Sequence, residues 1–231
     1  MNNLMSIIIP CYNYGKYLEE CVKSVINNVT DLDIEIIIVD DASTDNSFEI
    51  AKKLEQTFNF CKVIKNDINK KLPYTRNKGI KNSNGNYIIC LDADDLIPDN
   101  YIQENIKIID NGVDISYSDS QCFGTINKRF NWPNFNIEIL RQNNFIHCAA
   151  MYRREVWEKV GGYDESFIYG SEDYDFWLRA AKLGFNFKKC EKTHLLYRRT
   201  NETMIDSVSH LHVNEIKEQL KIKHKEFYKG G

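Results

Sequence analysis

The feature that most constrains this chain is a regular alternation of short apolar runs and helical patterns in its first half. Apolar runs of strand length lie at 6–10, 34–39, 61–65, 87–91 and 113–117. Between them, apolar residues recur every three or four positions, as on one face of a helix, over 18–26, 46–56, 73–81 and 98–109. Strands and helices in this order form a mostly parallel sheet with helices on both faces. The sequence therefore predicts an α/β fold with a Rossmann-like first half.

The second half of the chain is less regular. Residues 121–144 contain a Trp-Pro pair and many asparagines, which predicts an extended or mobile excursion. We then expect a strand at 148–152, a helix at 154–160, a helix from about Asp173, and an amphipathic helix at about 211–229. We find no repeat and no linker composition, so the prediction is one domain over residues 1–231.

Composition excludes several classes of protein. The chain has 231 residues and a formal net charge of -3, whereas a nonspecific nucleic-acid binder is usually basic. It lacks a secretion-signal pattern and an apolar run of about 20 residues, which predicts a cytoplasmic protein. The lysines of the C-terminal helix leave peripheral membrane contact open, and a homodimer is open as well. Seven scattered cysteines fit neither a disulfide framework nor a zinc site, so we expect buried free thiols.

Acidic residues follow two of the apolar runs directly. Asp40 and Asp41 come after one run, and Asp92, Asp94 and Asp95 come after another. In open parallel sheets, ligands bind beyond the carboxyl ends of the strands. An Asp-x-Asp turn there suits Mg2+ or Mn2+, and a nucleotide diphosphate could supply the remaining ligands. Alone the triplet is weak evidence, because Asp is common in turns, but its place after a buried strand strengthens it.

Five motifs in order resemble a known family. They are SIIIPCYN at 6–13, VDDASTD at 39–45, RNKG at 76–79, LDADD at 91–95 and GSED at 170–173. Together they resemble family 2 of the inverting glycosyltransferases, which have the GT-A fold, over about residues 6–204. The resemblance implies a donor nucleotide-binding half at about 1–118 and an acceptor and catalytic half at about 119–210.

On this resemblance, the first two motifs bind the donor nucleoside. Pro10, Tyr12 and Asn13 would line its pocket, and Asp41 would hydrogen-bond uracil or another base. Asp40 could share that task. A simpler interpretation of residues 41–45 is a turn that leads into a helix.

The middle motifs would hold the diphosphate and its metal. The resemblance implies that Arg76 reaches the base or a phosphate, although alone it could be a surface helix residue. Asp92 would contact the ribose or a metal-bound water, Ala93 would lie in the same nucleotide-binding turn, and Asp94 would ligate Mn2+ or Mg2+ directly.

The last motif would supply the catalytic base. Asp173 would take the proton from the acceptor hydroxyl, although an Asp at this position could also cap the following helix. Glu172 could tune Asp173 or hold an acceptor hydroxyl. Tyr169 and Gly170, with residues 121–144, would form the acceptor side.

One position departs from the family pattern. Many members carry Tyr-Arg-x-His near the end of the catalytic region, where this chain has Thr200 in place of His. Arg198 or Arg199 would compensate by charge. His147 and His194 have no partner at ligand spacing, so we expect them to be packed or hydrogen-bonded.

These observations predict a metal-dependent inverting transfer from a nucleotide-diphosphate sugar, foremost a UDP-sugar, to a hydroxyl acceptor. The acceptor would be a saccharide or lipid-linked sugar of surface polysaccharide synthesis. The alternative is a catalytically silent sugar- or nucleotide-binding domain. Two other interpretations fit less well. An enzyme of sugar-1-phosphate nucleotidyl transfer usually has a glycine-rich loop after its first strand, and this chain has none there. A phospho-acceptor signalling domain would be much shorter.

Overall fold

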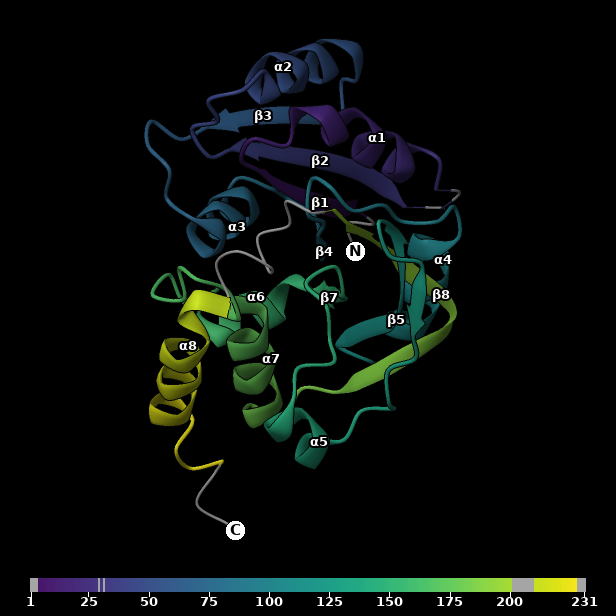
Figure 1. The fold of residues 1–231 in the computed structure, drawn as a ribbon. Helices are drawn as coiled ribbons and strands as arrows, with labels where there is room; N and C mark the ends of the chain where they lie inside the picture. The colour runs from purple at the N-terminus through teal and green to yellow at the C-terminus, as the bar shows by residue number, and fades with distance from the viewer. Residues whose placement is uncertain (1–3, 29, 31, 201–209, 228–231) are drawn as a thin grey trace.

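A computed structural model of the chain describes residues 4–28, 30, 32–200 and 210–227. They form one α/β domain around a mixed, mostly parallel sheet with strand order β3-β2-β1-β4-β7-β5-β6, with β8 paired to β5 (Figure 1). The strands are β1 (Leu4–Cys11), β2 (Asp33–Asp40), β3 (Cys61–Lys65), β4 (Tyr87–Cys90), β5 (Ile115–Gly124), β6 (Lys128–Phe130), β7 (Met151–Arg153) and β8 (Phe187–Arg199). Strands β1 to β4 pair in parallel, as does β8 with β5, whereas β6 and β7 are antiparallel to their neighbours.

Helices cover both faces of this sheet, which confirms the predicted architecture. They are α1 (Gly15–Ile26), α2 (Ser47–Thr57), α3 (Leu72–Lys81), α4 (Tyr101–Asp110), α5 (Ile137–Gln142), α6 (Arg154–Val160), α7 (Glu172–Lys182) and α8 (His210–Lys223). No helix among the described residues has both the length and the apolar character needed to cross a membrane.

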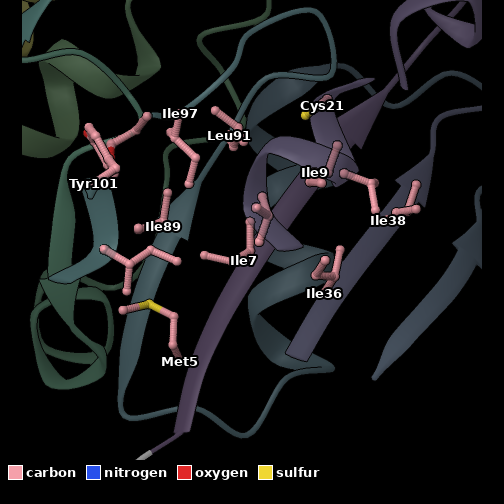
Figure 2. Packing of buried hydrophobic residues seen from close by; sticks show 14 of the residues in the cluster. Met5, Ile7, Ile9, Cys21, Ile36, Ile38, Ile89, Leu91, Ile97 and Tyr101 are labelled. Carbon is pink, nitrogen blue, oxygen red and sulfur yellow. The ribbon is translucent and has the colours of Figure 1, made fainter. Parts of the chain in front are cut away.

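Alternation along the central strands divides the interior into two cores. Ile7 and Ile9 of β1 face a core closed by α1, α2 and α4, and Figure 2 shows part of this packing. Ile8 faces the opposite core, which is closed by α3 and by α5 to α8. Each fully buried isoleucine contributes about 1.5–3 kcal/mol to stability. A strand with isoleucine on both faces is therefore held firmly, and β1 and β4 present rigid carboxyl ends to the site.

The prediction for residues 121–144 was incomplete. The segment contains the end of β5, strand β6 and helix α5. Asn136, which the composition suggested was a loop residue, caps α5: its Oδ1 accepts hydrogen bonds from the backbone N–H of Glu138 and Ile139, at 2.8 and 3.3 Å. Asparagine serves both loops and helix starts, so composition alone does not separate them.

The sequence patterns also do not predict β8. This strand carries lysine and glutamate at its exposed positions, and a register shift between Ser118 and Asp119 interrupts its pairing with β5. Both features obscure the alternation of apolar and polar residues, with a period of two, that is typical of a strand. The expectation for the cysteines is confirmed, because all seven are buried and free.

Candidate active site

The carboxyl ends of β1, β2 and β4 meet at one edge of the sheet, where the predicted motifs come together. Cys11 at the end of β1 pairs with Asp40 at the end of β2. Asp40 is fully buried, and its Oδ2 accepts a hydrogen bond from the Ser43 backbone N–H at 3.3 Å. Its Oδ1 has no hydrogen-bond partner among the described residues. Buried carboxylate oxygens normally have partners, so this oxygen is an unsatisfied acceptor at the edge of the sheet.

Asp41 organises a second loop at this edge. Its carboxylate accepts hydrogen bonds from the Asn66 side-chain amide at 2.7 Å and from the backbone N–H groups of Lys70 and Lys71 at 2.8 and 2.9 Å. Asp41 is buried, so these contacts hold residues 66–71 against the end of β2. The structure thus gives Asp41 a scaffolding role beside the role in base recognition that the sequence predicted.

The residues of the first motif differ in their surroundings: Asn13 makes structural hydrogen bonds, Tyr12 is exposed and Pro10 is buried. Asn13 has a left-handed backbone with φ of 59°, and its Oδ1 accepts hydrogen bonds from the backbone N–H groups of Thr44 and Asp45. It therefore braces the 43–45 turn. Tyr12 is 42% exposed, so its ring is accessible to a ligand, whereas Pro10 is buried in β1.

The LDADD motif forms a compact acidic turn after β4. Asp95 is buried, and its Oδ1 accepts a hydrogen bond from the Arg198 backbone N–H at 2.8 Å. Arg198 Nε donates to the Asp94 carbonyl oxygen at 2.7 Å, so β8 holds the turn in place. Burial and the neighbouring carboxylate of Asp92 raise the pKa of Asp94 to about 7, and burial also raises the pKa of Asp95 well above its ordinary value. Ala93, 1% exposed, packs in the core beneath the turn.

This turn fits a divalent cation that is shared with a ligand. Its carboxylates repel one another, and Asp95 Oδ2 has no partner among the described residues. Among those residues, no cluster of three or more metal-ligating side chains is found. A cation at Asp94 would therefore take most of its ligands from a diphosphate and from water, as Mg2+ usually does.

Arg76 joins the acidic turn to the last motif. It lies on α3 and is 1% exposed, so the interpretation as a surface residue is wrong. Its Nη2 donates to Asp92 Oδ1 at 2.7 Å, and its Nη1 pairs with Glu172 Oε1. The predicted contact with a base or phosphate would have to be made beside these two ion pairs. Cys148 completes the cluster, because its thiol donates to Asp92 Oδ2 at 3.4 Å.

Asp173 stands in the first turn of α7, next to Glu172. The N-cap of α7 is Ser171, so Asp173 is not the cap, although its Oδ1 accepts a hydrogen bond from the Tyr174 backbone N–H at 2.7 Å. Burial and the charge of Glu172 raise the pKa of Asp173 to about 7, against the opposing effect of Arg76. A carboxyl group with this pKa can exchange a proton near neutral pH. Glu172 is buried, and its Oε2 has no partner among the described residues.

The structure also describes the remaining residues that the sequence singled out. Tyr169 is half-buried and stacks on His212 of α8 with ring centroids 3.7 Å apart, and Gly170 follows it with a φ of +113°. Thr200 follows the end of β8 and is half-buried. His147 is hydrogen-bonded to Ser118, as expected of a packed histidine, and burial lowers its pKa to about 4.

Sequence reasoning missed the contacts of Cys148 and Asp95. An acidic residue beside a metal motif is a weak signal that could have marked Asp95. The position of Cys148 beside Asp92 depends on β7 entering the sheet next to β4, and we find no local pattern that indicates it.

Comparison with known proteins identifies the family. The family model described as glycosyl transferase family 2 matches residues 6–161, and a glycosyltransferase-like family 2 model matches residues 117–229. A glycosyltransferase of Methanocaldococcus jannaschii is 30% identical over 209 residues, which are 86% of this chain and 71% of that protein. The chondroitin synthase of Pasteurella multocida is 29% identical over 195 residues, 82% of this chain but 20% of the synthase.

Solved structures share the fold. S. aureus TarS 1-349 in complex with UDP-GlcNAc has a TM-score of 0.74 at 21% identity, covering 88% of this chain and 60% of that chain. The mannosyltransferase PcManGT of Pyrobaculum calidifontis, in complex with GDP-Man and Mn2+, has a TM-score of 0.71 at 17% identity, covering 98% of this chain and 65% of that chain.

The fold is that of a GT-A glycosyltransferase. Because the first family model spans well over half of its residues, the chain belongs to glycosyl transferase family 2. The sequence-based prediction of family and fold is confirmed.

Proposed function

We propose that this chain transfers a sugar, with inversion, from a nucleotide-diphosphate donor to a hydroxyl acceptor with the help of a divalent cation. The observation that carries the proposal is the Arg76 bridge. One guanidinium holds Asp92 and Glu172, so the acidic turn that contains Asp94 and the first turn of α7, which contains Asp173, are joined through Arg76. An inverting transfer needs this pairing of a diphosphate site with a separate carboxylate base.

Asp173 is the proposed base. The acceptor oxygen attacks the anomeric carbon while the bond from that carbon to the diphosphate oxygen breaks, and the acceptor proton passes to the Asp173 carboxylate. A single displacement of this kind inverts the anomeric centre. With a pKa of about 7, Asp173 is partly ionised at neutral pH and still basic enough to accept the proton.

Asp94 is the proposed protein ligand of Mn2+ or Mg2+, with Asp92 held beside it by Arg76. When bound, the cation neutralises the charge that develops on the leaving diphosphate. A cation would also relieve the repulsion that raises the pKa of Asp94 and Asp95. The Mn2+ in the mannosyltransferase complex supports this assignment by analogy of fold.

We assign the nucleoside to the edge of the sheet at Tyr12, Asp40, Asp41 and residues 66–71. Asp40 Oδ1 is buried and has no partner among the described residues, so it could accept an N–H from a base that displaces the groups covering it. Uracil offers such a group, and TarS binds UDP-GlcNAc on the same fold, so UDP is the first candidate. The chondroitin synthase relative supports a polysaccharide or related glycan as the product class.

Calorimetry tests the donor and metal assignments. UDP, GDP and dTDP are titrated with and without Mn2+ into the wild type, Asp94→Asn and Asp173→Asn. We expect Mn2+-dependent binding of one nucleotide, lost in Asp94→Asn and kept in Asp173→Asn, while transfer by Asp173→Asn falls about 10²–10⁴-fold. Equal binding without metal would refute the metal assignment. Binding of no nucleotide would favour a silent sugar-binding domain.

A further inference from the structure

The segment that leads into the proposed base has an unusual backbone. Gly170 and Ser171 both have positive φ, at +113° and 66°. Ser171 is the N-cap of α7 and makes no side-chain capping hydrogen bond. A left-handed conformation is unfavourable for a non-glycine residue and persists where surrounding contacts fix it. Whatever holds this segment also sets the position of Asp173.

Helix α8 lies along this segment and contacts it at three places. The His212 ring stacks on Tyr169, with centroids 3.7 Å apart and planes 4° apart. Gln219 Nε2 donates to Ser166 Oγ at 2.8 Å, and Lys223 Nζ donates to Asp164. These three residues of α8 are seven and four positions apart, which places them along one side of the helix.

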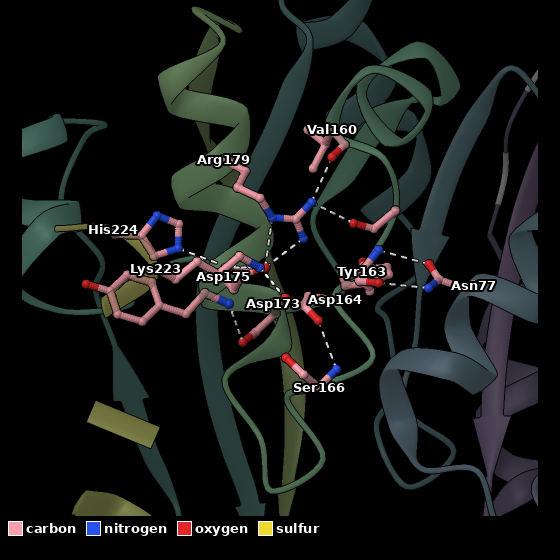
Figure 3. A network of polar contacts seen from close by, with 12 residues as sticks. Asn77, Val160, Tyr163, Asp164, Ser166, Asp173, Asp175, Arg179, Lys223 and His224 are labelled. Atoms are coloured by element: carbon pink, nitrogen blue, oxygen red, sulfur yellow. Dashed lines mark hydrogen bonds and ion pairs between the residues drawn. The ribbon is translucent and has the colours of Figure 1, made fainter. Parts of the chain in front are cut away.

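A buried ionic cluster fixes the other end of the segment (Figure 3). Asp175, on the same turn of α7 as Asp173, is fully buried. Its Oδ1 accepts from Lys223 Nζ at 2.8 Å and from His224 Nε2 at 2.9 Å, and its Oδ2 accepts from Arg179 Nε at 2.8 Å. These partners lower the pKa of Asp175, so it is ionised.

Arg179 extends the cluster to the turn after α6. Its Nη1 donates to the carbonyl oxygens of Val160 and Gly162, both at 2.8 Å. The cluster thus ties α7 to α8 on one side and to the end of α6 on the other. Ile216 and Leu220 of α8 also pack in the apolar core that contains residues of α7, and such packing can hold helices together without ion pairs. Buried ion pairs add little net stability, but they favour one relative orientation.

We propose that α8 is a positioning element of the active site, which holds the segment 164–175 through its contacts with that segment and thereby places Asp173. The inference rests on the proposed role of Asp173 as the base. Asp175, Lys223, His224 and His212 are positioning residues, because they act through α7 and not on the substrate. Ile216 and Leu220 of α8 pack into this core, whereas Val213 and Ile222 are exposed.

The double variant Lys223→Met/His224→Leu tests the proposal on the full chain. Lys221→Met is the matched control, because Lys221 is exposed and pairs with Glu218 on the same helix. Binding of UDP, GDP and dTDP with Mn2+ is measured by calorimetry. Turnover is followed as nucleoside diphosphate released from UDP-glucose, GDP-mannose or dTDP-glucose with water as acceptor.

We expect the double variant to bind nucleotide within twofold of wild type, because the contacts of α8 described above do not involve Tyr12, Asp40, Asp41 or residues 66–71. We expect kcat to fall at least tenfold. The acid limb of the kcat profile should move to lower pH. A loosened segment admits water to Asp173, and burial is the main cause of its raised pKa. The charged and titratable groups that face Asp173 are Glu172, Arg76, Asp92 and Cys148, and none of them is altered. Rescue by Lys223→Arg/His224→Gln would confirm the geometric origin.

Hydrogen exchange separates failure of this proposal from failure of the proposed function. Even if the wild type binds and turns over none of the three donors, the amides of 170–175 should exchange at least tenfold faster in the double variant, with those of α1 to α3 unchanged. If the double variant proves unfolded, His212→Ala supplies the same test from the other end of the segment. Unchanged exchange, or unchanged kcat and pH profile in a folded variant, would overturn the proposal.

Discussion

Replacing Asp173 by Asn should stabilise the fold at high pH, although it removes the proposed base. Its pKa rises from 3.8 to about 7 on folding, so the folded state disfavours the ionised carboxylate. Such a group costs stability progressively as pH rises from about 4 to 7, and the full cost amounts to about 4 kcal/mol. Because Asp173 is half-buried and partly screened by water, we take about half of this, ~2 kcal/mol. Asn keeps an oxygen to accept the Tyr174 N–H.

Asp175→Asn is the matched control, two residues further along the same helix. Asp175 has a lowered pKa, so its ionised form stabilises the fold at neutral pH and loses this contribution only as the pH falls below its ordinary value. Removing the charge leaves Lys223 and Arg179 without their buried partner, at a cost of about 3–5 kcal/mol. Two isosteric substitutions on one helical turn should therefore shift stability in opposite directions.

Urea unfolding of wild type and both variants, with EDTA present, measures these effects at pH 8 and pH 5. We expect Asp173→Asn to exceed wild type by about 2 kcal/mol at pH 8 and by less than half of that at pH 5. If Asp173→Asn is less stable than wild type at pH 8, or if its difference from wild type does not change with pH, then Asp173 is not held in the folded state with a raised pKa.

Three further changes have defined outcomes. Arg76→Met should lower the free energy of unfolding by about 3–5 kcal/mol in urea unfolding, with only partial recovery in Arg76→Lys, because one ammonium cannot replace the fork that pairs two carboxylates. Gly162→Ala should lower the melting temperature more than Gly161→Ala: both glycines have φ near +80°, but a Cβ at Gly162 would lie 2.9 Å from Asn77 Oδ1, whereas the space at Gly161 is open. The seven cysteines are buried with raised pKa values, so an alkylating reagent should label the native protein only at the rate of its opening, measured by mass spectrometry.

Features of this structure that depend on residues close together in the sequence were predicted, whereas contacts between distant residues were not. Strands β1 to β4 and their helices are marked by local apolar periods, and their motifs lie at strand ends, so the acidic edge was predictable. The ion pair between Arg76 and Glu172 could not be predicted, because the two residues are 96 positions apart and no local pattern indicates that they are in contact. Strand β8 was not predicted because its exposed positions carry charged residues. Helix α5 was not predicted because Asn136, which caps it, is also a common loop residue.

The Arg76 bridge also has a consequence for how the chain reaches its folded state. As the chain emerges from the ribosome, α3 and β4 are synthesised well before residue 172, so the Arg76 guanidinium has only Asp92 to pair with. The edge of β4 that later receives β7 is also uncovered at that stage. A half-made chain therefore carries an incompletely paired internal charge and an open strand edge, which are both features of species that associate wrongly. The bridge can close only after residue 172 has been synthesised, so the complete set of acidic residues meets only in a chain that extends past α7.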